Sequence, residues 1–236
     1  MKVAVFTGIR DLEVCERPMP VLERPGDVLL QIETVGVCGS DIHYYTEGRI
    51  GGQVIEHPAT LGHECAGTVV EVGSVVAGLE AGQRVAIDPA ISCGQCDQCQ
   101  QGRAHTCRNL QFLGCPGQAP GAATEYITIA AESCYPIPDS MTMVQAALVE
   151  PLSVGIHAVR LAEMQPGGAV AVLGSGPIGL SVLLAVGALC PSRTYVTDLL
   201  DNRLELAKRC GADWTGVPTS ERSEEPTSEL QSRAHL

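Results

Sequence analysis

Four cysteines in the middle of the chain have the spacing of a metal site. The pattern Cys-x2-Cys-x2-Cys-x7-Cys is formed by Cys93, Cys96, Cys99 and Cys107. Because four thiolates complete the tetrahedral shell of a zinc ion and leave no open position, the pattern predicts a structural zinc site. Free thiols and an iron–sulfur cluster are the alternatives, the second because Cys115 is followed by a proline. The interval before Cys115 is too long for the ferredoxin motif, which favours zinc.

Cysteine, histidine and carboxylate side chains also occur in three separate motifs that could form a second zinc site. These motifs are Val37-Cys38-Gly39-Ser40-Asp41, Gly62-His63-Glu64 and Glu150-Pro151. Three protein ligands leave a fourth position for water or substrate, which catalysis requires. Zinc held by Cys38, His63 and a carboxylate would polarise an alcohol oxygen and lower the pKa of that hydroxyl, which favours the loss of hydride. Each motif alone is more typical of ordinary core and loop, so the set is a hypothesis.

Polar residues that follow Cys38 suit the other steps of an alcohol oxidation. Asp41 is a natural hydrogen-bond partner for the ligating histidine. Ser40 and His43 could pass the alcohol proton to solvent. We therefore expect this short segment to combine zinc binding with proton transfer.

A glycine-rich segment has the sequence and context of a dinucleotide-binding turn. Gly174-Ser175-Gly176-Pro177-Ile178-Gly179 follows an apolar run at 169–173 that predicts a buried strand, and it opens an apolar helix over 178–189. The three glycines permit a tight turn, and the helix N-terminus would receive a pyrophosphate. Asp198, at the end of the next predicted strand, would accept hydrogen bonds from ribose hydroxyls and repel a 2′-phosphate, which predicts NAD rather than NADP. The alternative is a glycine turn without a ligand.

The composition argues against several classes of partner. The 236 residues carry a formal net charge of −12, and Lys2 and Lys208 are the only lysines. Without a cluster of basic residues, neither nucleic acid nor an anionic membrane is an expected partner. The uncharged run 164–192 is long enough to span a bilayer, but glycines and a proline interrupt it, which favours a strand, a turn and a buried helix. No secretory signal is recognised and the cysteines suit a reducing compartment, so we expect a cytoplasmic protein.

The chain is predicted to contain two domains of different character. Alternating apolar residues and turn signals in residues 1–150 predict an all-β body, with strands over 28–35, 67–72 and 84–87. Within this domain, residues 88–115 form the four-cysteine lobe.

Residues 151–219 have the β-α-β-α pattern that opens a doubly wound parallel sheet. A helical pattern with a proline interruption covers 143–160, a second strand is expected at 194–198, and a helix over 202–209 ends with Gly211 as its C-cap. We expect no third strand and helix, because the residues that follow are rich in serine and glutamate.

Together these motifs resemble those of the zinc-dependent medium-chain dehydrogenases, and most of all their polyol branch of sorbitol and xylitol dehydrogenases. The resemblance covers about residues 1–217. Besides the glycine-rich turn, it is carried by Gly36-Val37-Cys38-Gly39-Ser40-Asp41-Ile42-His43-Tyr44-Tyr45, Gly48-Arg49-Ile50-Gly51, Leu61-Gly62-His63-Glu64 and Val149-Glu150-Pro151-Leu152-Ser153-Val154-Gly155. It implies an α/β protein whose β-rich catalytic domain is a GroES-like partly open barrel, followed by the first half of a Rossmann doubly wound parallel sheet.

The resemblance also implies roles for individual residues. Cys38, His63 and Glu64 would bind the catalytic zinc, Glu64 either directly or through a shift in coordination. Glu150 would be a fourth ligand or would hold the zinc-bound water and the substrate, and Tyr44 would contact the polyol. Ile178, Asp198 and Arg203 would line the NAD site.

The implied function is a zinc- and NAD-dependent oxidation of a secondary alcohol of a polyol to a ketose, in a complete protein that is a homotetramer. Another zinc alcohol dehydrogenase or an L-threonine dehydrogenase is the alternative within the class. Family members continue through the rest of the dinucleotide sheet and return to the catalytic domain. We therefore expect a C-terminally truncated chain with a non-native tail at 220–236, and an inactive zinc-binding fragment is the alternative from another class.

Overall fold

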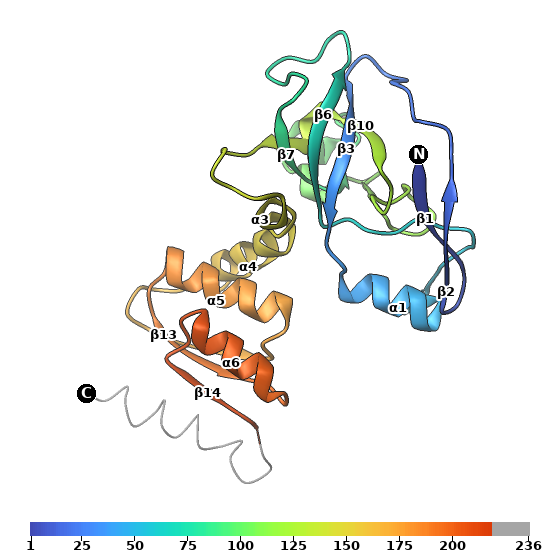
Figure 1. Cartoon of the computed structure of the whole chain (residues 1–236). Helices are drawn as coiled ribbons and strands as arrows, with labels where there is room; N and C mark the ends of the chain where they lie inside the picture. The colour runs from blue at the N-terminus through green and yellow to red at the C-terminus, as the bar shows by residue number, and fades with distance from the viewer. Residues whose placement is uncertain (219–236) are drawn as a thin grey trace. The chain divides into compact units, whose positions relative to one another are not determined.

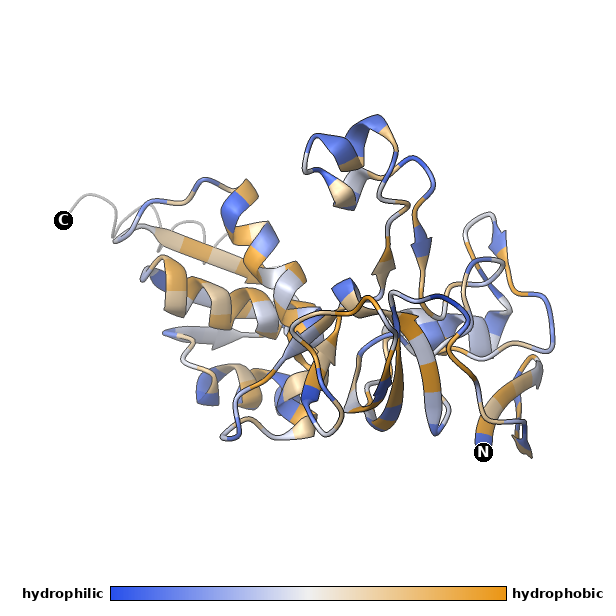
Figure 2. Cartoon of the chain, turned by 90° about the horizontal axis from the view of Figure 1, so that it is seen from above, coloured by the Kyte–Doolittle hydropathy of each residue, from blue (hydrophilic) through white to orange (hydrophobic). Residues whose placement is uncertain are grey.

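The computed structural model describes residues 1–218, which form two compact units. The first unit is Met1–Glu150 and the second begins at Pro151. Each unit has its own sheet, and Figure 2 shows that the apolar residues concentrate on the strands and on the helix faces against them. The tail expected at 220–236 lies outside the described residues.

The first unit is built on a five-stranded antiparallel sheet of order β10-β3-β6-β7-β11. Its strands are β3 (Asp27–Val35), β6 (Cys65–Val72), β7 (Arg84–Ile87), β10 (Tyr126–Ala130) and β11 (Cys134–Pro136), of which β3, β6, β7 and β10 are labelled in Figure 1. The alternating side chains of β3 and β6, among them Val28, Leu30 and Val69, fill the core between the strands and the loops. Because β10 and β11 are the two edges and do not pair with each other, the sheet stays an open barrel.

Shorter elements surround this sheet. They are β1 (Lys2–Gly8), β2 (Asp11–Glu16), α1 (Gly39–Glu47), β4 (Arg49–Ile50), β5 (Gln53–Val54), β8 (Ala90–Ile91), α2 (Asp97–Gln100), β9 (Gln111–Phe112) and two single 3₁₀ turns at Ala104–Thr106 and Ala131–Ser133. Three antiparallel pairs form among them, β1 with β2, β4 with β5 and β8 with β9. The hairpin of β8 and β9 therefore flanks the segment that carries the four-cysteine pattern.

The helical pattern expected over 143–160 is two helices, α3 (Met143–Ala147) and α4 (Val149–Leu161). The expected interruption at the proline is wrong, because the break falls at Leu148 and Pro151 lies in the first turn of α4. Proline is tolerated there, since the backbone N–H groups of a first helical turn have no intrahelical partner.

The second unit is a three-stranded parallel sheet of order β12-β13-β14. Its elements are β12 (Ala169–Leu173), α5 (Pro177–Leu189), β13 (Arg193–Thr197), α6 (Asp201–Arg209) and β14 (Trp214–Gly216). Val172, Leu183, Val196 and Ala207 form one cluster, so α5 and α6 cover the same face of the sheet (Figure 1). On the other face of β12, Ala169, Ala171 and Leu173 are exposed.

The third strand, β14, corrects the expectation that no strand follows the second helix. It has three residues, too few to show a periodic pattern in the sequence, and it forms by parallel pairing of Trp214 and Thr215 with β13. The Trp214 ring packs against that of Tyr195 at a centroid distance of 6.4 Å. Among residues 1–218, none of the helices is both long and apolar enough to cross a membrane.

Candidate functional site

The register of β3 and β6 brings the first two dispersed motifs together. Val35 at the end of β3 pairs with Cys65 at the start of β6, and the Gly36 N–H donates to the Glu64 carbonyl at 2.6 Å. Because the two strands are antiparallel, the residues just after β3 lie next to those just before β6, which places Cys38 beside His63. One ligand atom each from Cys38, His63 and Glu64 lies within 4.8 Å of the other two. A thiol, an imidazole and a carboxylate at this spacing are a donor set that suits zinc.

Asp41 links the start of α1 to His63. Cys38 is the N-cap of α1, and its backbone N–H donates to Asp41 Oδ2 at 2.9 Å. The other carboxylate oxygen, Oδ1, lies 4.0 Å from His63 Nδ1. Both side chains are buried. Nδ1 of His63 thus faces the Asp41 carboxylate at ion-pair distance, an arrangement that would leave Nε2 for a metal.

Gly36 provides the space for the Glu64 carboxylate. A Cβ atom added at Gly36 would lie 2.4 Å from Glu64 Oε2 and 2.9 Å from Glu64 Cβ. Real Cβ atoms essentially never approach other atoms this closely, so a side chain at position 36 would force the buried Glu64 carboxylate to move.

Cys38 and His63 stabilise each other's charged forms. A hydrogen bond from His63 lowers the pKa of Cys38 against the opposing effect of burial, and hydrogen bonds from Ser40 lower it further. For His63, burial opposes the positive charge, but the hydrogen bond to Cys38 and the charges of Asp41, Cys38 and Glu150 raise its pKa. The site therefore favours the thiolate that zinc requires, and the proton on His63 is the one a metal must displace.

Glu150 stands next to this trio but is not part of it. The three residues whose ligand atoms cluster are Cys38, His63 and Glu64. Burial raises the pKa of Glu150, His63 lowers it, and the negative charges of Glu64 and Asp88 raise it. The geometry thus puts Glu64 nearer to a direct ligand position than Glu150. Sequence reasoning missed Asp88, which follows β7 and carries no motif.

The three residues expected to handle proton and substrate occupy different environments on α1. Ser40 hydrogen-bonds to the sulfur of Cys38. His43 lies on the exposed side, where Nδ1 is 3.4 Å from Glu47 Oε1. Tyr44 is buried, and its ring packs with Ile55 and Leu61.

Sequence reasoning also missed Phe112 and Gln53 on the wall of the site, and it considered Cys115 only for the iron–sulfur alternative. The Phe112 ring lies edge-on to His63 at a centroid distance of 5.4 Å. Gln53 accepts a hydrogen bond from the Tyr44 hydroxyl and donates one to Cys115. No motif marks these positions, because only the fold brings β5 and the turn after β9 to α1.

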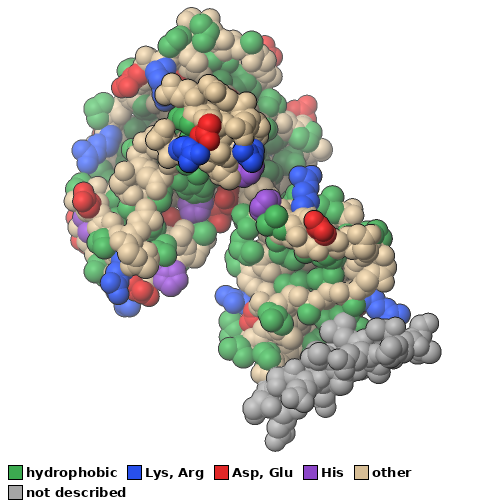
Figure 3. Space-filling view, turned by 180° about the vertical axis from the view of Figure 1, so that it is seen from behind, with side chains coloured by type: hydrophobic (Ala, Val, Ile, Leu, Met, Phe, Trp, Pro, Cys, Tyr) green, Lys and Arg blue, Asp and Glu red, His purple; other side chains and the backbone are tan. Residues whose placement is uncertain are grey.

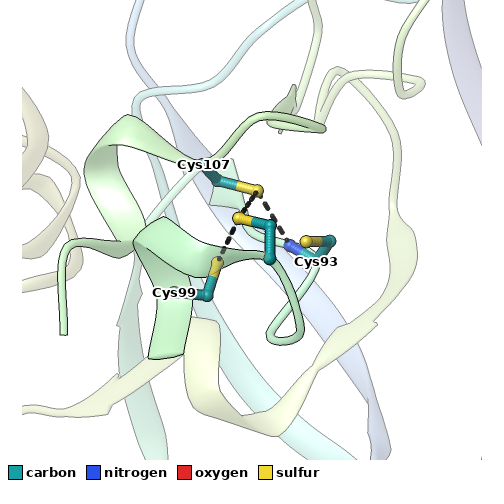
Figure 4. Close-up of side chains that lie close together, drawn as sticks. Cys93, Cys99 and Cys107 are labelled. Carbon is teal, nitrogen blue, oxygen red and sulfur yellow. Dashed lines mark hydrogen bonds between the residues drawn. The ribbon is translucent and has the colours of Figure 1, made fainter. Parts of the chain in front are cut away.

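The four cysteines of the local pattern converge on one point, as Figure 4 shows for Cys93, Cys99 and Cys107. One sulfur from each of Cys93, Cys96, Cys99 and Cys107 lies within 4.8 Å of the others. Cys96 Sγ is 3.6 Å from Cys99 Sγ and 3.9 Å from Cys107 Sγ. Cys115 is not in this group and instead accepts a hydrogen bond from Gln53 at 3.0 Å, so the structure does not bring the Cys-Pro of the ferredoxin motif to the cluster.

Backbone and side-chain donors support this cluster. The N–H groups of Cys93 and Asn109 donate to Cys107 Sγ at 3.3 and 3.4 Å. Backbone hydrogen bonds from Arg108 and Cys99 lower the pKa of Cys96 to about 6, whereas loss of solvation raises that of Cys99 to about 11. Arg108 also holds the lobe through a two-point ion pair with Asp97, at 2.5 and 2.7 Å.

The glycine-rich turn connects β12 to α5 in the second unit. Gly174 has a φ of +95°, which favours glycine, and a Cβ at Gly179 would lie 1.9 Å from the Gly174 carbonyl oxygen. Gly176 is the N-cap of α5 and Pro177 its first residue, with Ile178 next and half exposed. The turn therefore directs the backbone N–H groups of a helix N-terminus toward the end of the sheet.

Asp198 follows β13 and is tied to this turn. Its Oδ2 accepts from the Ser175 N–H at 2.8 Å and its Oδ1 accepts from the Leu200 N–H at 3.0 Å. These backbone bonds, first that of Leu200, lower the pKa of Asp198, so the carboxylate stays charged. Arg203 Nη1 lies 3.6 Å from Asp198 Oδ2. On the face drawn in Figure 3, Lys and Arg side chains are scattered among acidic ones.

Comparison with known proteins identifies relatives of this chain. The alcohol dehydrogenase GroES-like domain matches residues 24–139. The sorbitol dehydrogenase of Bacillus subtilis is 44% identical over 212 residues, which are 90% of this chain and 60% of that protein. A protein of Neosartorya fischeri named "Probable D-xylulose reductase A" is 38% identical over 214 residues, 91% of this chain and 60% of its own length.

The same relationship holds among solved structures. An oxidoreductase/dehydrogenase of unknown specificity from Escherichia coli superposes with a TM-score of 0.87 at 33% identity, covering 98% of this chain and 67% of that one. The expected fold class is confirmed, with a GroES-like open barrel followed by part of a Rossmann-like sheet. The chain spans about 60% of the length of the two curated relatives.

Proposed function

Because the chain belongs to the zinc-dependent medium-chain alcohol dehydrogenases, we propose that the protein transfers hydride from a secondary alcohol of a polyol to NAD. The products would be a ketose, reduced NAD and a proton. The observation that carries the proposal is the cluster of Cys38, His63 and Glu64, whose ligand atoms lie within 4.8 Å of one another. The names of the relatives, sorbitol dehydrogenase and D-xylulose reductase, favour a polyol over other alcohols.

Cys38, His63 and Glu64 would hold the catalytic zinc. When bound, the metal supplies Lewis-acid polarisation of an alcohol oxygen at its open position. Asp41 would fix the His63 ring through Nδ1, and Gly36 would leave Glu64 free to reach the site. Glu150, a half-buried carboxyl with a raised pKa, would hold the substrate or water from the side.

The proton of the alcohol must leave while hydride is transferred. Ser40, beside Cys38, would take up the first hydrogen bond in the relay, and His43, with an exposed ring, would pass the proton to solvent. Tyr44 would contact a second hydroxyl of the polyol. This division suits α1, where Ser40 in the first turn lies beside Cys38, His43 is exposed and Tyr44 is buried.

The glycine-rich turn and Asp198 would bind NAD. Gly174, Gly176 and Gly179 would admit the pyrophosphate to the N-terminus of α5, beside Pro177 and Ile178. Asp198 is a charged acceptor at the end of β13, where it would bind the ribose hydroxyls and repel a 2′-phosphate. Arg203 would flank the adenosine side while its guanidinium stays near Asp198.

Cys93, Cys96, Cys99 and Cys107 would hold a second, structural zinc ion. Four thiolates leave no position for substrate, so this site would stabilise the lobe only. From the family resemblance we also propose that the complete protein is a cytoplasmic homotetramer, with another zinc alcohol dehydrogenase or an L-threonine dehydrogenase as the alternative within the family.

A second candidate function is zinc binding without turnover. It is favoured by the exposed residues Ala169, Ala171 and Leu173 on one face of β12, because such a face normally packs against further elements of the sheet. A chain of this kind would bind two zinc ions and produce no reduced NAD.

The test is a polyol oxidation assay with the zinc-loaded full chain. Reduced NAD should accumulate with xylitol or sorbitol, and Cys38→Ala should abolish it, whereas the control Cys15→Ala in β2 should not. Two zinc ions per chain with no turnover on any polyol or simple alcohol would favour the second candidate.

A further inference from the structure

A chain of hydrogen bonds joins Tyr44, Gln53 and Cys115, which come from three separate elements of the first unit. The Tyr44 hydroxyl lies 3.0 Å from Gln53 Oε1. Gln53 Nε2 donates to Cys115 Sγ at 3.0 Å and to the Pro116 carbonyl at 3.3 Å. The chain thus connects α1, β5 and the turn that follows β9.

The partners of Gln53 fix which way its amide points. A carbonyl oxygen can only accept a hydrogen bond, so the amide nitrogen, and not the amide oxygen, must face Pro116. The amide oxygen then faces Tyr44 and can only accept. The Tyr44 hydroxyl must therefore donate its single proton to Gln53.

This direction decides what Tyr44 can offer to a ligand. With its proton given to Gln53, the phenol oxygen retains lone pairs and can accept a hydrogen bond but cannot donate one. Burial raises the pKa of Tyr44, and the charges of Cys115 and Asp41 raise it further, so the phenol keeps its proton. The group that complements Tyr44 is a hydroxyl that donates.

The hydrogen-bonded chain lies beside the metal-binding trio. Tyr44 is three residues after Asp41 on α1, hence on the same side of the helix, and Asp41 contacts His63. Gly114, just before Cys115, packs on the backbone of Gly62, where a Cβ at Gly114 would meet the Gly62 oxygen at 2.8 Å. A substrate held at the trio would therefore lie on the side of α1 that carries Tyr44.

We propose that Gln53 is a positioning residue that fixes Tyr44 as a hydrogen-bond acceptor. The site would then select alcohols that carry a second, donating hydroxyl over those with an ether or a methylene in its place. The inference rests on the proposed function, because it concerns the substrate of the same site. It assigns the preference for polyols to the orientation of one amide.

The test compares binding of matched alcohols to the zinc-loaded full chain. Xylitol and pentane-2,3-diol carry a neighbouring hydroxyl, 3-methoxypentan-2-ol carries an ether, and pentan-2-ol carries neither. Dissociation constants come from NMR titration. Wild type should prefer the diol to the ether, and Gln53→Leu should reduce that preference about tenfold, the effect of one hydrogen bond. The exposed Gln31 on β3 gives the control variant, Gln31→Leu, which should keep the preference.

Two further variants test whether Gln53 acts through Tyr44 or only supports the structure of the site. Tyr44→Phe should lose the preference for the diol, and the double variant Tyr44→Phe with Gln53→Leu should lose no more than Tyr44→Phe alone. An unchanged preference in Gln53→Leu, or independent losses in the double variant, would overturn the inference.

The hydroxyl proton of Tyr44 gives a readout that does not depend on a bound alcohol. Donated to Gln53 inside the protein, it should give a slowly exchanging NMR resonance that Gln53→Leu removes and Gln31→Leu keeps. If wild type shows this resonance but binds no alcohol, the proposed function fails while the orientation of Tyr44 stands. If Gln53→Leu leaves the resonance unchanged, the inference fails whatever the protein binds.

Discussion

The two candidate metal sites of the first unit are assembled in opposite ways. The four cysteines lie within 15 consecutive residues, and a short helix and backbone N–H groups bring their sulfurs together. Cys38 is separated from His63 and Glu64 in the sequence by α1 and the β4–β5 hairpin, and the register of β3 and β6 joins them. A local site needs only its own loop, whereas a dispersed site needs the whole sheet.

Removing one ligand of the four-cysteine site should give the largest loss of zinc and of local structure. It also tests most directly whether the two sites are independent. Cys107→Ser should release about one zinc ion per chain and unfold the lobe, because three thiolates no longer close the shell. Metal analysis and limited proteolysis around the lobe measure both losses. The trio should keep its zinc, since β3 and β6 do not depend on the lobe. Loss of both metals would show that the two sites are coupled.

A larger residue beside Glu64 should lower the zinc affinity of Cys38, His63 and Glu64 without removing any of these ligands. Gly36→Ala places a methyl group against Glu64 and should reduce zinc affinity at the trio about 10- to 100-fold, the usual range for disturbed ligand support. Gly39→Ala is the matched control, because a Cβ there meets nothing within 4 Å. Competition with a chelator measures both affinities. Equal affinities in the two variants would mean that Glu64 does not bind the metal.

The pH dependence of zinc binding should distinguish the two sites further. At the trio, the raised pKa of His63 keeps its proton to a higher pH than usual, and zinc must displace that proton. Apparent affinity should therefore fall as the pH falls through the His63 pKa, by about tenfold per pH unit below it. At the four-cysteine site, Cys99 with a pKa of about 11 remains protonated, so affinity there should keep rising above neutral pH. Chelator titrations of Cys107→Ser and Cys38→Ala isolate each site, and a flat profile at the trio would contradict the first expectation.

The smallest effect of a substitution is expected at a third, partly local site, the glycine-rich turn and Asp198 that we propose to bind NAD. Asp198→Asn keeps the hydrogen-bond geometry but removes the charge that would repel a 2′-phosphate. The preference for NAD over NADP should fall about tenfold, as expected for one charged contact. Binding of both dinucleotides to the full chain measures this, with Asp201→Asn at the exposed start of α6 as control. A preference that stays the same would remove Asp198 from cofactor selection.

The same contrast explains what could be predicted from the sequence. Strands such as 28–35 and 84–87 carry apolar residues between clear turn signals and were predictable to within a residue, as was the strand–turn–helix at Gly174, because their signals are local. The three residues of β14 were not, since they form a strand only by pairing with β13. The break at Leu148 was assigned to Pro151, because the pattern does not show where a helix starts relative to its proline.

The residues of the candidate site likewise fall into those that a local motif predicts and those that only the fold brings to the site. Cys38, His63 and Glu64 could be named from their motifs, although their approach to one another depends on a sheet register that no short pattern specifies. Gln53, Asp88 and Phe112 could not be named, because they carry no motif, and Cys115 was considered only as a metal ligand and not as a partner of Gln53. Their places follow only from the fold around α1.

The most direct test of the central claim, that this chain builds two independent zinc sites, is the zinc content per purified chain in wild type and single variants. The account predicts about two zinc ions in wild type, and about one in each of Cys38→Ala, His63→Ala and Cys107→Ser. About one zinc ion in wild type, unchanged by Cys38→Ala or His63→Ala, would contradict it and leave the four-cysteine lobe as the only metal site.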